Sequence, residues 1–251
     1  MYPDSPNPDP DYTPATRQPR STEDLFAPEE EQQRGVPLVA QFDEQPILTY
    51  LLIGLLVLVH FFLTAQGGIG RLQAYADYAN VSELVTQGEY YRLFTSMFLH
   101  ADLTHLLFNC LGLFIFGKEV ERLFGHFRFG VVYLGGGLVG SVASYWITSG
   151  SSIGASGAVF AVFGAFGAYI YRHRKLYGEA ANRQIRSLLV LAAVNLGIGF
   201  LSNAPGSPVR IDNAAHVGGA LGGLALALAL GPRYQVRMEV NPGRHLASAP
   251  H

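Results

Sequence analysis

The stretch NAAHVGGALGGLALALAL, residues 213–230, decides the fold of this 251-residue chain. It contains no Asp, Glu, Lys or Arg, and its length is close to the roughly 20 mostly apolar residues that an α-helix needs to cross a bilayer. Two overlapping G-x-x-x-G patterns are formed by Gly218, Gly219, Gly222 and Gly223. Such patterns let a second membrane helix approach backbone to backbone. The stretch therefore predicts a membrane helix in a close-packed bundle.

Five further apolar runs precede this stretch, so the chain is expected to be an all-α, polytopic membrane protein with six crossings. The other runs are residues 47–64, 103–117, 129–148, 154–171 and 187–202. The composition agrees, because 49% of the residues are apolar and only 14% are charged, which is less charge than an ordinary soluble domain carries. Residues 64–101, between the first two crossings, are rich in aromatic side chains and are expected to form a partly interfacial loop.

The two ends of the chain differ in composition from its body. Residues 1–46 hold ten acidic and three basic side chains and are rich in proline. Such a segment buries too little apolar surface to offset its ordering entropy, so we expect a disordered tail. Residues 47–231 are predicted to form the membrane domain, and residues 232–251 a short second tail. The body carries 14 basic and 9 acidic residues, a net +5, and its basic residues flank apolar runs, which favours a bilayer partner over nucleic acid.

The positions of Lys and Arg predict the orientation. With six crossings, both tails and the loops after the second and fourth crossings share one side, and this side holds 14 of the 17 basic residues. Without residues 1–46 the ratio is still 11 to 3. Because basic loops stay in the cytoplasm, we expect both termini to be cytoplasmic.

Four polar residues are expected at one depth in the bundle. The second, fourth and sixth crossings run in the same direction, and near their beginnings lie His105 and Asn109, Ser156, and His216. At about 1.5 Å of rise per residue, all four lie a few turns below the outer surface. Polar side chains are costly inside a membrane and usually mark a functional site.

These residue types suit acyl transfer. A serine hydroxyl becomes nucleophilic when a neighbouring base takes its proton, and histidine is the usual base, which fits Ser156 and His216. The developing oxyanion needs positioned donors. His105 and Asn109, spaced i and i+4, project from one helix face and could supply them together with the Ser156 amide. The glycines of Gly154-Ala-Ser-Gly157 leave the backbone open to an approaching peptide.

Each of these candidate site residues also has a purely structural interpretation. Small residues such as those around Ser156 pack membrane helices in many proteins, and His105 and Asn109 could simply bond helices together.

Asp212 is expected to cap the last helix. No H-E-x-x-H motif is present, and we expect neither a metal nor another cofactor. A structural ion-pair cluster is expected from Glu119, Glu121, Arg122 and Arg128.

Three motifs resemble the rhomboid family. They are EYYRLFTSMFLHADLTHLLFN (89–109), GASG (154–157) and NAAHVGGALGG (213–223), in the family's order on a six-helix chain. The resemblance implies a Ser156–His216 dyad without a third carboxylate, with His105 and Asn109 stabilising the oxyanion. Tyr91 stands where the family usually has Trp. Phe160 stands where an aromatic residue, often Tyr, packs against the histidine.

The implied function is that of an intramembrane serine endopeptidase acting on transmembrane segments of other proteins. The six-helix form is similar to simple bacterial members, which implies an integral protein of the bacterial inner membrane with its active site opening to the outer side. Two alternatives differ in class: a non-catalytic relative that retains or escorts membrane proteins, and a small-solute transporter. The sequence leaves the physiological substrate and the oligomeric state open.

Overall fold

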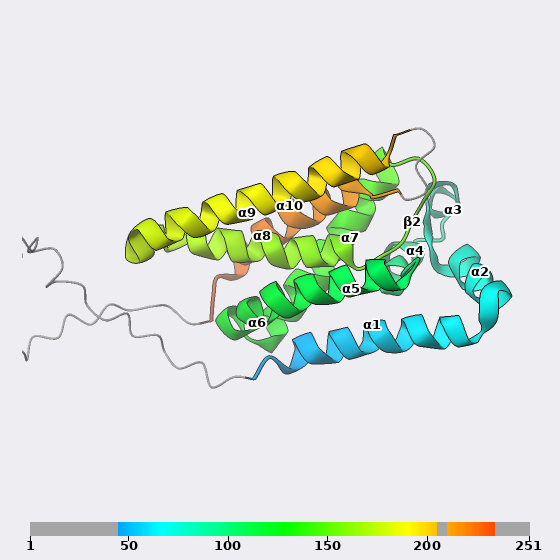
Figure 1. Cartoon of the computed structure of the whole chain (residues 1–251), viewed down its shortest axis with the longest axis horizontal. Helices are drawn as coiled ribbons and strands as arrows, with labels where there is room; N and C mark the ends of the chain where they lie inside the picture. Colours follow the sequence, from blue (N-terminus) through cyan, green and yellow to red (C-terminus); the bar gives the residue numbers. More distant parts are fainter. Residues whose placement is uncertain (1–44, 205–209, 234–251) are drawn as a thin grey trace, which may run out of the picture. The chain divides into compact units, whose positions relative to one another are not determined.

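The structure is a computed structural model that describes residues 45–204 and 210–233. The predicted tails, 1–46 and 232–251, lie outside the described residues except for 45–46 and 232–233. Within the described ranges, five spans are long and apolar enough to cross a membrane (Figure 1). They are α1 (Ile47–Ala65), the continuous span Leu103–Phe124, α7 (His126–Ile147), α9 (Arg174–Ser202) and α10 (Asn213–Leu230). The chain is therefore a helical membrane bundle, as the sequence predicts.

The remaining predicted crossing is α8 (Ser156–Arg172), which packs against α7, α9 and α10. Its 17 residues rise about 26 Å, somewhat less than the roughly 30 Å of a bilayer's hydrocarbon layer. Ala158, Ala161 and Ala165 along it are fully buried. Neighbouring helices rather than lipid cover much of this helix, so its length need not match the bilayer closely.

Two of the predicted helix boundaries are wrong. The second crossing does not stop at residue 117. It consists of α5 (Leu103–Gly112), the π-helical turn η3 (Leu113–Gly117) and α6 (Lys118–Phe124). Helix α9 begins at Arg174 rather than at residue 187, with a kink at Gly178, where φ is 51°. The added turns are charged but rich in helix-forming residues, so the apolar pattern ends before the helix does.

Glycines allow α10 to pack against α8 with almost no side chain between the two backbones. A Cβ added at Gly219 would lie 2.0 Å from the Gly157 carbonyl oxygen, and one added at Gly223 would lie 1.9 Å from the Ala161 carbonyl oxygen. Any larger residue would force the helices apart. The close approach predicted from the G-x-x-x-G patterns is confirmed.

The segment between α1 and α5 is folded rather than an open loop. It contains α2 (Gly67–Tyr78), β1 (Asn80–Val81), α3 (Ser82–Thr86), α4 (Arg92–Thr95) and the 3₁₀ turn η2 (Ser96–Phe98). Buried Arg92 holds it together, since its Nε donates to Glu89 at 2.6 Å and its Nη1 donates to the carbonyl oxygens of Ala76 and Ala79 at 2.8 and 3.1 Å. Strand β1 pairs antiparallel with β2 (Ser151–Ser152). The folded segment is thereby tied to the residues just before Ser156.

The helix directions define two ends of the bundle. At one end α5, α8 and α10 begin and α7 ends, and we call this the serine end. At the other end α1 and α7 begin and α6 ends, and we call this the Glu121 end. The 22 residues of α7 separate the two ends by about 33 Å.

A carboxylate caps α1 at the Glu121 end. Glu121, on α6, is 1% exposed and accepts the backbone N–H groups of Leu48 and Thr49 at 2.8 and 2.7 Å. It also accepts the Thr49 hydroxyl at 2.6 Å and contacts His126 Nδ1. These are the first amides of a membrane helix, which have no partner within the helix. Glu121 therefore satisfies donors that would otherwise be left without a hydrogen-bond partner.

The expected ion-pair cluster is consequently only partly correct. Arg122 pairs with Glu119 at 3.3 Å on the surface. Arg128 donates to the Gly231 carbonyl oxygen at 3.4 Å rather than to a carboxylate. Glu121 joins neither arginine, because burial places it against the start of α1.

Candidate active site

Ser156 is the first residue of α8 and is half-buried. The chain reaches it through Gly154, whose φ of +127° favours glycine. The Gly154 amide donates to the Ser96 carbonyl oxygen at 2.9 Å. The β1–β2 pair lies two residues further back. Two attachments thus fix the short loop before Ser156 to the folded segment that precedes α5.

His216 lies in the first turn of α10 and is 7% exposed. Its ring stacks on the Phe160 ring, with a centroid distance of 4.3 Å and an interplanar angle of 12°. Phe160 follows Ser156 by four residues, so both side chains lie on the same face of α8. The contact predicted from the position of Phe160 is confirmed, and His216 faces the side of α8 that carries Ser156.

Within residues 45–204 and 210–233, no hydrogen bond joins the Ser156 hydroxyl to the His216 ring. Buried His216 Nδ1 has no partner among the described residues either. Hydrogen bonds of catalytic groups are often long in ligand-free structures and shorten when substrate binds. The fold brings the two residues to one face of a tight helix pair without forming the bond.

The two expected oxyanion donors differ in their surroundings. The His105 ring lies against the loop before Ser156, because a Cβ added at Gly154 would be 2.6 Å from both Cε1 and Nε2 of that ring. Asn109 is 4% exposed, and its Nδ2 donates to the His105 carbonyl oxygen at 3.0 Å within the same helix. The structure thus brings His105 next to the Ser156 loop and gives Asn109 a bond within α5.

A family model described as the rhomboid domain matches residues 87–233, more than half of the chain. The chain belongs to the rhomboid family. It is 38% identical over 208 residues to rhomboid protease GluP of Bacillus subtilis, a match that covers 82% of this chain and 39% of GluP. It is 39% identical over 160 residues to RHOMBOID-like protein 2 of Arabidopsis thaliana, covering 63% of this chain and 48% of that protein.

A third similar protein is rhomboid protease AarA of Providencia stuartii. It is 31% identical over 176 residues, which cover 60% of this chain and 59% of AarA. The chain therefore spans between about two fifths and three fifths of the length of these relatives.

A further histidine of this rhomboid bundle lies next to the proposed oxyanion donor His105. His100 is 2% exposed, and its ring meets the His105 ring edge to face at a centroid distance of 5.1 Å. Burial, with smaller effects of His105 and His60, lowers the pKa of His100 to about 3. His100 is therefore neutral, and its ring packs against the ring of His105. The sequence places His100 just before the second crossing, where it could lie near the site or form a structural hydrogen bond. Among the described residues neither ring nitrogen has a hydrogen-bond partner, and the contact with His105 depends on how the chain turns before α5.

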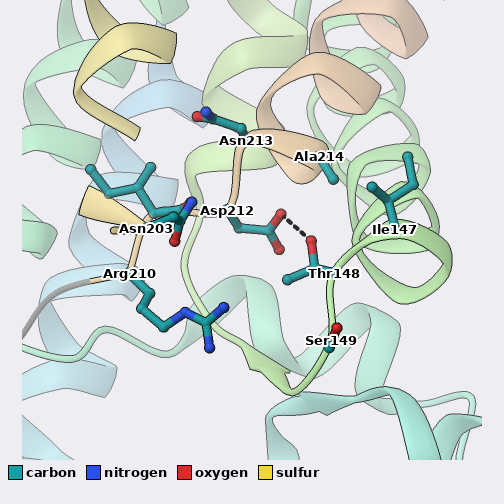
Figure 2. A pocket seen from close by; sticks show the side chains of 9 residues that line it. Ile147, Thr148, Ser149, Asn203, Arg210, Asp212, Asn213 and Ala214 are labelled. Atoms are coloured by element: carbon teal, nitrogen blue, oxygen red, sulfur yellow. Dashed lines mark hydrogen bonds between the residues drawn. The ribbon is translucent and has the colours of Figure 1, made fainter. Parts of the chain in front are cut away.

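No metal centre forms in the described part of this rhomboid chain, where no three His, Cys, Asp or Glu side chains are arranged to hold an ion. A pocket of about 300 Å³ opens at the serine end, between the end of α7 and the start of α10 (Figure 2). Its polar lining residues include Thr148, Arg210 and Asp212. Neither Ser156 nor His216 belongs to its lining, so the pocket lies beside the candidate site rather than in it.

Proposed function

We propose that this rhomboid protein is an intramembrane serine endopeptidase in which Ser156 is the nucleophile and His216 the general base. The observation that carries the proposal is the stacking of His216 on Phe160 at 4.3 Å, one turn from Ser156. Helices in backbone contact at Gly157 and Gly219 hold this arrangement. The names of GluP and AarA, both rhomboid proteases, support the same activity.

In the proposed reaction the Ser156 oxygen attacks the carbonyl carbon of a peptide bond as His216 takes the hydroxyl proton. The tetrahedral intermediate collapses, the C–N bond breaks, and His216 returns the proton to the leaving amine. A water molecule then attacks the acyl-enzyme, again with His216 as base. The products are two peptides, and Ser156 is restored as the free hydroxyl.

The oxyanion of each intermediate requires donors near Ser156. The His105 ring is the best-placed side chain, since it lies against Gly154, two residues before Ser156. The Ser156 amide, at an unpaired helix start, is a second donor. Asn109 contributes through its second amide hydrogen, the first being bonded to the His105 carbonyl oxygen. Loss of one such donor typically slows a serine protease by about 10²–10³-fold.

The proposed substrates are transmembrane segments of other proteins, which reach the site from the bilayer and unwind locally at the serine end. The distribution of basic residues supports cytoplasmic termini in a bacterial inner membrane. With that orientation the serine end, where α5, α8 and α10 begin, faces the outer side.

The test is cleavage of a fluorescent transmembrane substrate by purified protein in detergent. Wild type should cleave, Ser156→Ala should not, and Ser151→Ala should match wild type, because Ser151 is an exposed serine of the same loop. Equal cleavage by Ser156→Ala and wild type would refute the assignment. A non-catalytic relative that retains membrane proteins would bind the substrate without cleaving it, and a transporter would do neither.

A further inference from the structure

At the serine end, one carboxylate connects the start of α10 to the end of α7. Asp212, the residue before α10, accepts the Ala215 amide at 3.0 Å, which confirms the predicted cap. It also accepts the Thr148 hydroxyl at 2.9 Å, and Figure 2 shows this bond crossing from the start of α10 to the end of α7. The hydroxyl of Ser144, in the last turn of α7, donates to its other oxygen.

The donor set explains why this carboxylate stays charged. Burial alone would raise the pKa of Asp212, but the hydrogen bonds from Ser144, the Ala215 amide and Thr148 outweigh it and hold the pKa below its ordinary value. A charged acceptor forms stronger hydrogen bonds than a neutral one. The network is therefore intact at neutral pH.

The connected parts lead to the two proposed catalytic residues. Thr148, at the end of α7, begins the loop to Ser156. Asp212 lies one helical turn before His216, whose amide donates to the Asp212 carbonyl oxygen at 3.2 Å. Asp212 is not the third member of a triad, because within the described residues His216 Nδ1 forms no hydrogen bond to its carboxylate or to any other group. The hydrogen bonds of its carboxylate instead come from Ser144 and Thr148 at the end of α7 and from the Ala215 amide of α10.

We infer that Asp212 is a positioning residue for the dyad: it ties the first turn of α10, which carries His216, to the end of α7, where the loop to Ser156 begins, and so fixes the Ser156–His216 geometry. This inference rests on the proposed function. Since the dyad lacks a preformed hydrogen bond, its productive geometry depends on how firmly the two helix starts are held.

The experiment measures kcat and KM of Asp212→Ala and Asp212→Asn on the fluorescent transmembrane substrate, with thermal unfolding in the same detergent. A displacement of about 1 Å can cost roughly 10²-fold in rate, so Asp212→Ala should lower kcat by that order with little change in KM. Asn is as good a helix cap as Asp, so Asp212→Asn keeps the Ala215 bond and should lose less, about tenfold.

Glu121→Gln is the matched control, because it neutralises a capping carboxylate at the other end of the bundle. It should lower the unfolding temperature and leave kcat within about twofold. If it lowers kcat as much as Asp212→Asn at the same loss of stability, the effect is general destabilisation and the inference is wrong.

If Asp212→Ala does not fold, variants that each remove one hydrogen-bond donor to Asp212 still test the inference. Ser144→Ala and Thr148→Val each remove one bond, and each should lower kcat severalfold at unchanged KM. Wild-type kcat in these variants and in Asp212→Asn overturns the inference. If Ser156→Ala is inactive while all network variants are fully active, only this inference fails. If Ser156→Ala is as active as wild type, the proposed function fails as well.

Discussion

Glu121 and Asp212 stand at opposite ends of α7 and perform the same local task with different neighbours. Each carboxylate accepts amide hydrogens at the start of a membrane helix, α1 for Glu121 and α10 for Asp212. The residues next to Glu121 are packing residues of α1 and α7, whereas the helix that Asp212 caps carries His216 one turn later. One kind of interaction thus supports folding at one end and, in our proposal, catalysis at the other.

The largest expected effect is a loss of activity without a loss of stability, caused by a substitution at the serine end. Ser156→Ala removes the nucleophile and should reduce cleavage to background, a loss of up to about 10⁶-fold in related serine protease chemistry. The free energy of unfolding should change by less than about 1 kcal/mol, because only one half-buried oxygen is lost. Cleavage rates and unfolding in detergent provide the two measurements. A stable, active Ser156→Ala variant would contradict the proposal that catalysis takes place at the serine end.

The second effect concerns the helix contact on which the serine end depends. Gly219→Val should abolish activity and destabilise the fold by at least about 1–3 kcal/mol, because a Cβ there would lie 2.0 Å from the Gly157 carbonyl oxygen. Gly54→Ala is the control, since nothing lies within 4 Å of a Cβ at that position on α1. Wild-type stability and activity of Gly219→Val would show that α8 and α10 do not pack this closely.

The third effect is expected in stability alone. Glu121→Gln weakens charged hydrogen bonds to Leu48 and Thr49, each of which contributes about 1.5–3 kcal/mol in soluble proteins, so the unfolding temperature should fall clearly. Glu119→Gln should change it little, because that side chain is 49% exposed. Unfolding curves of both variants test this, and equal curves would mean that the cap of α1 contributes nothing.

The fourth effect is smaller and concerns the serine end. Phe160→Leu removes the ring under His216, and aromatic stacking contributes about 0.5–1.5 kcal/mol. We expect a two- to tenfold fall in kcat. Phe160→Tyr keeps the ring and should retain most of the activity. An unchanged rate in Phe160→Leu would show that the stacking does not orient His216.

The smallest effect is a pH dependence of the Asp212 network. Its folded pKa lies below the ordinary value of 3.8, so the stability it contributes is fully present above that value and is lost as the pH falls through the folded pKa. The difference in stability between wild type and Asp212→Asn should therefore be constant from about pH 8 to 5 and shrink below about pH 4. A difference that grows on acidification would have the wrong sign.

The same two carboxylates show what the sequence could and could not predict. The cap at Asp212 was predictable because its amide partner is three residues away. The close approach of α8 and α10 was predictable because the spacing of the glycines indicates it directly. The role of Glu121 was not predictable, since its partners lie more than 70 residues earlier and only the fold brings them together. The loop network of Arg92 was missed although its partners lie only 3 to 16 residues away, because the fold of the segment decides which carbonyl oxygens face the guanidinium group. The prediction that Ser156 and His216 lie at one depth followed from helix direction, but a hydrogen bond between them depends on side-chain placement that periodicity does not report.

The most direct measurement is residue-level mapping of a fluorophosphonate adduct by mass spectrometry, on wild type and on His216→Ala. The expected result is an adduct on Ser156 of the wild type, with labelling strongly reduced when His216 is replaced, because the hydroxyl then lacks its base. An adduct on another residue, or equal labelling of Ser156 in both proteins, would contradict a Ser156–His216 dyad.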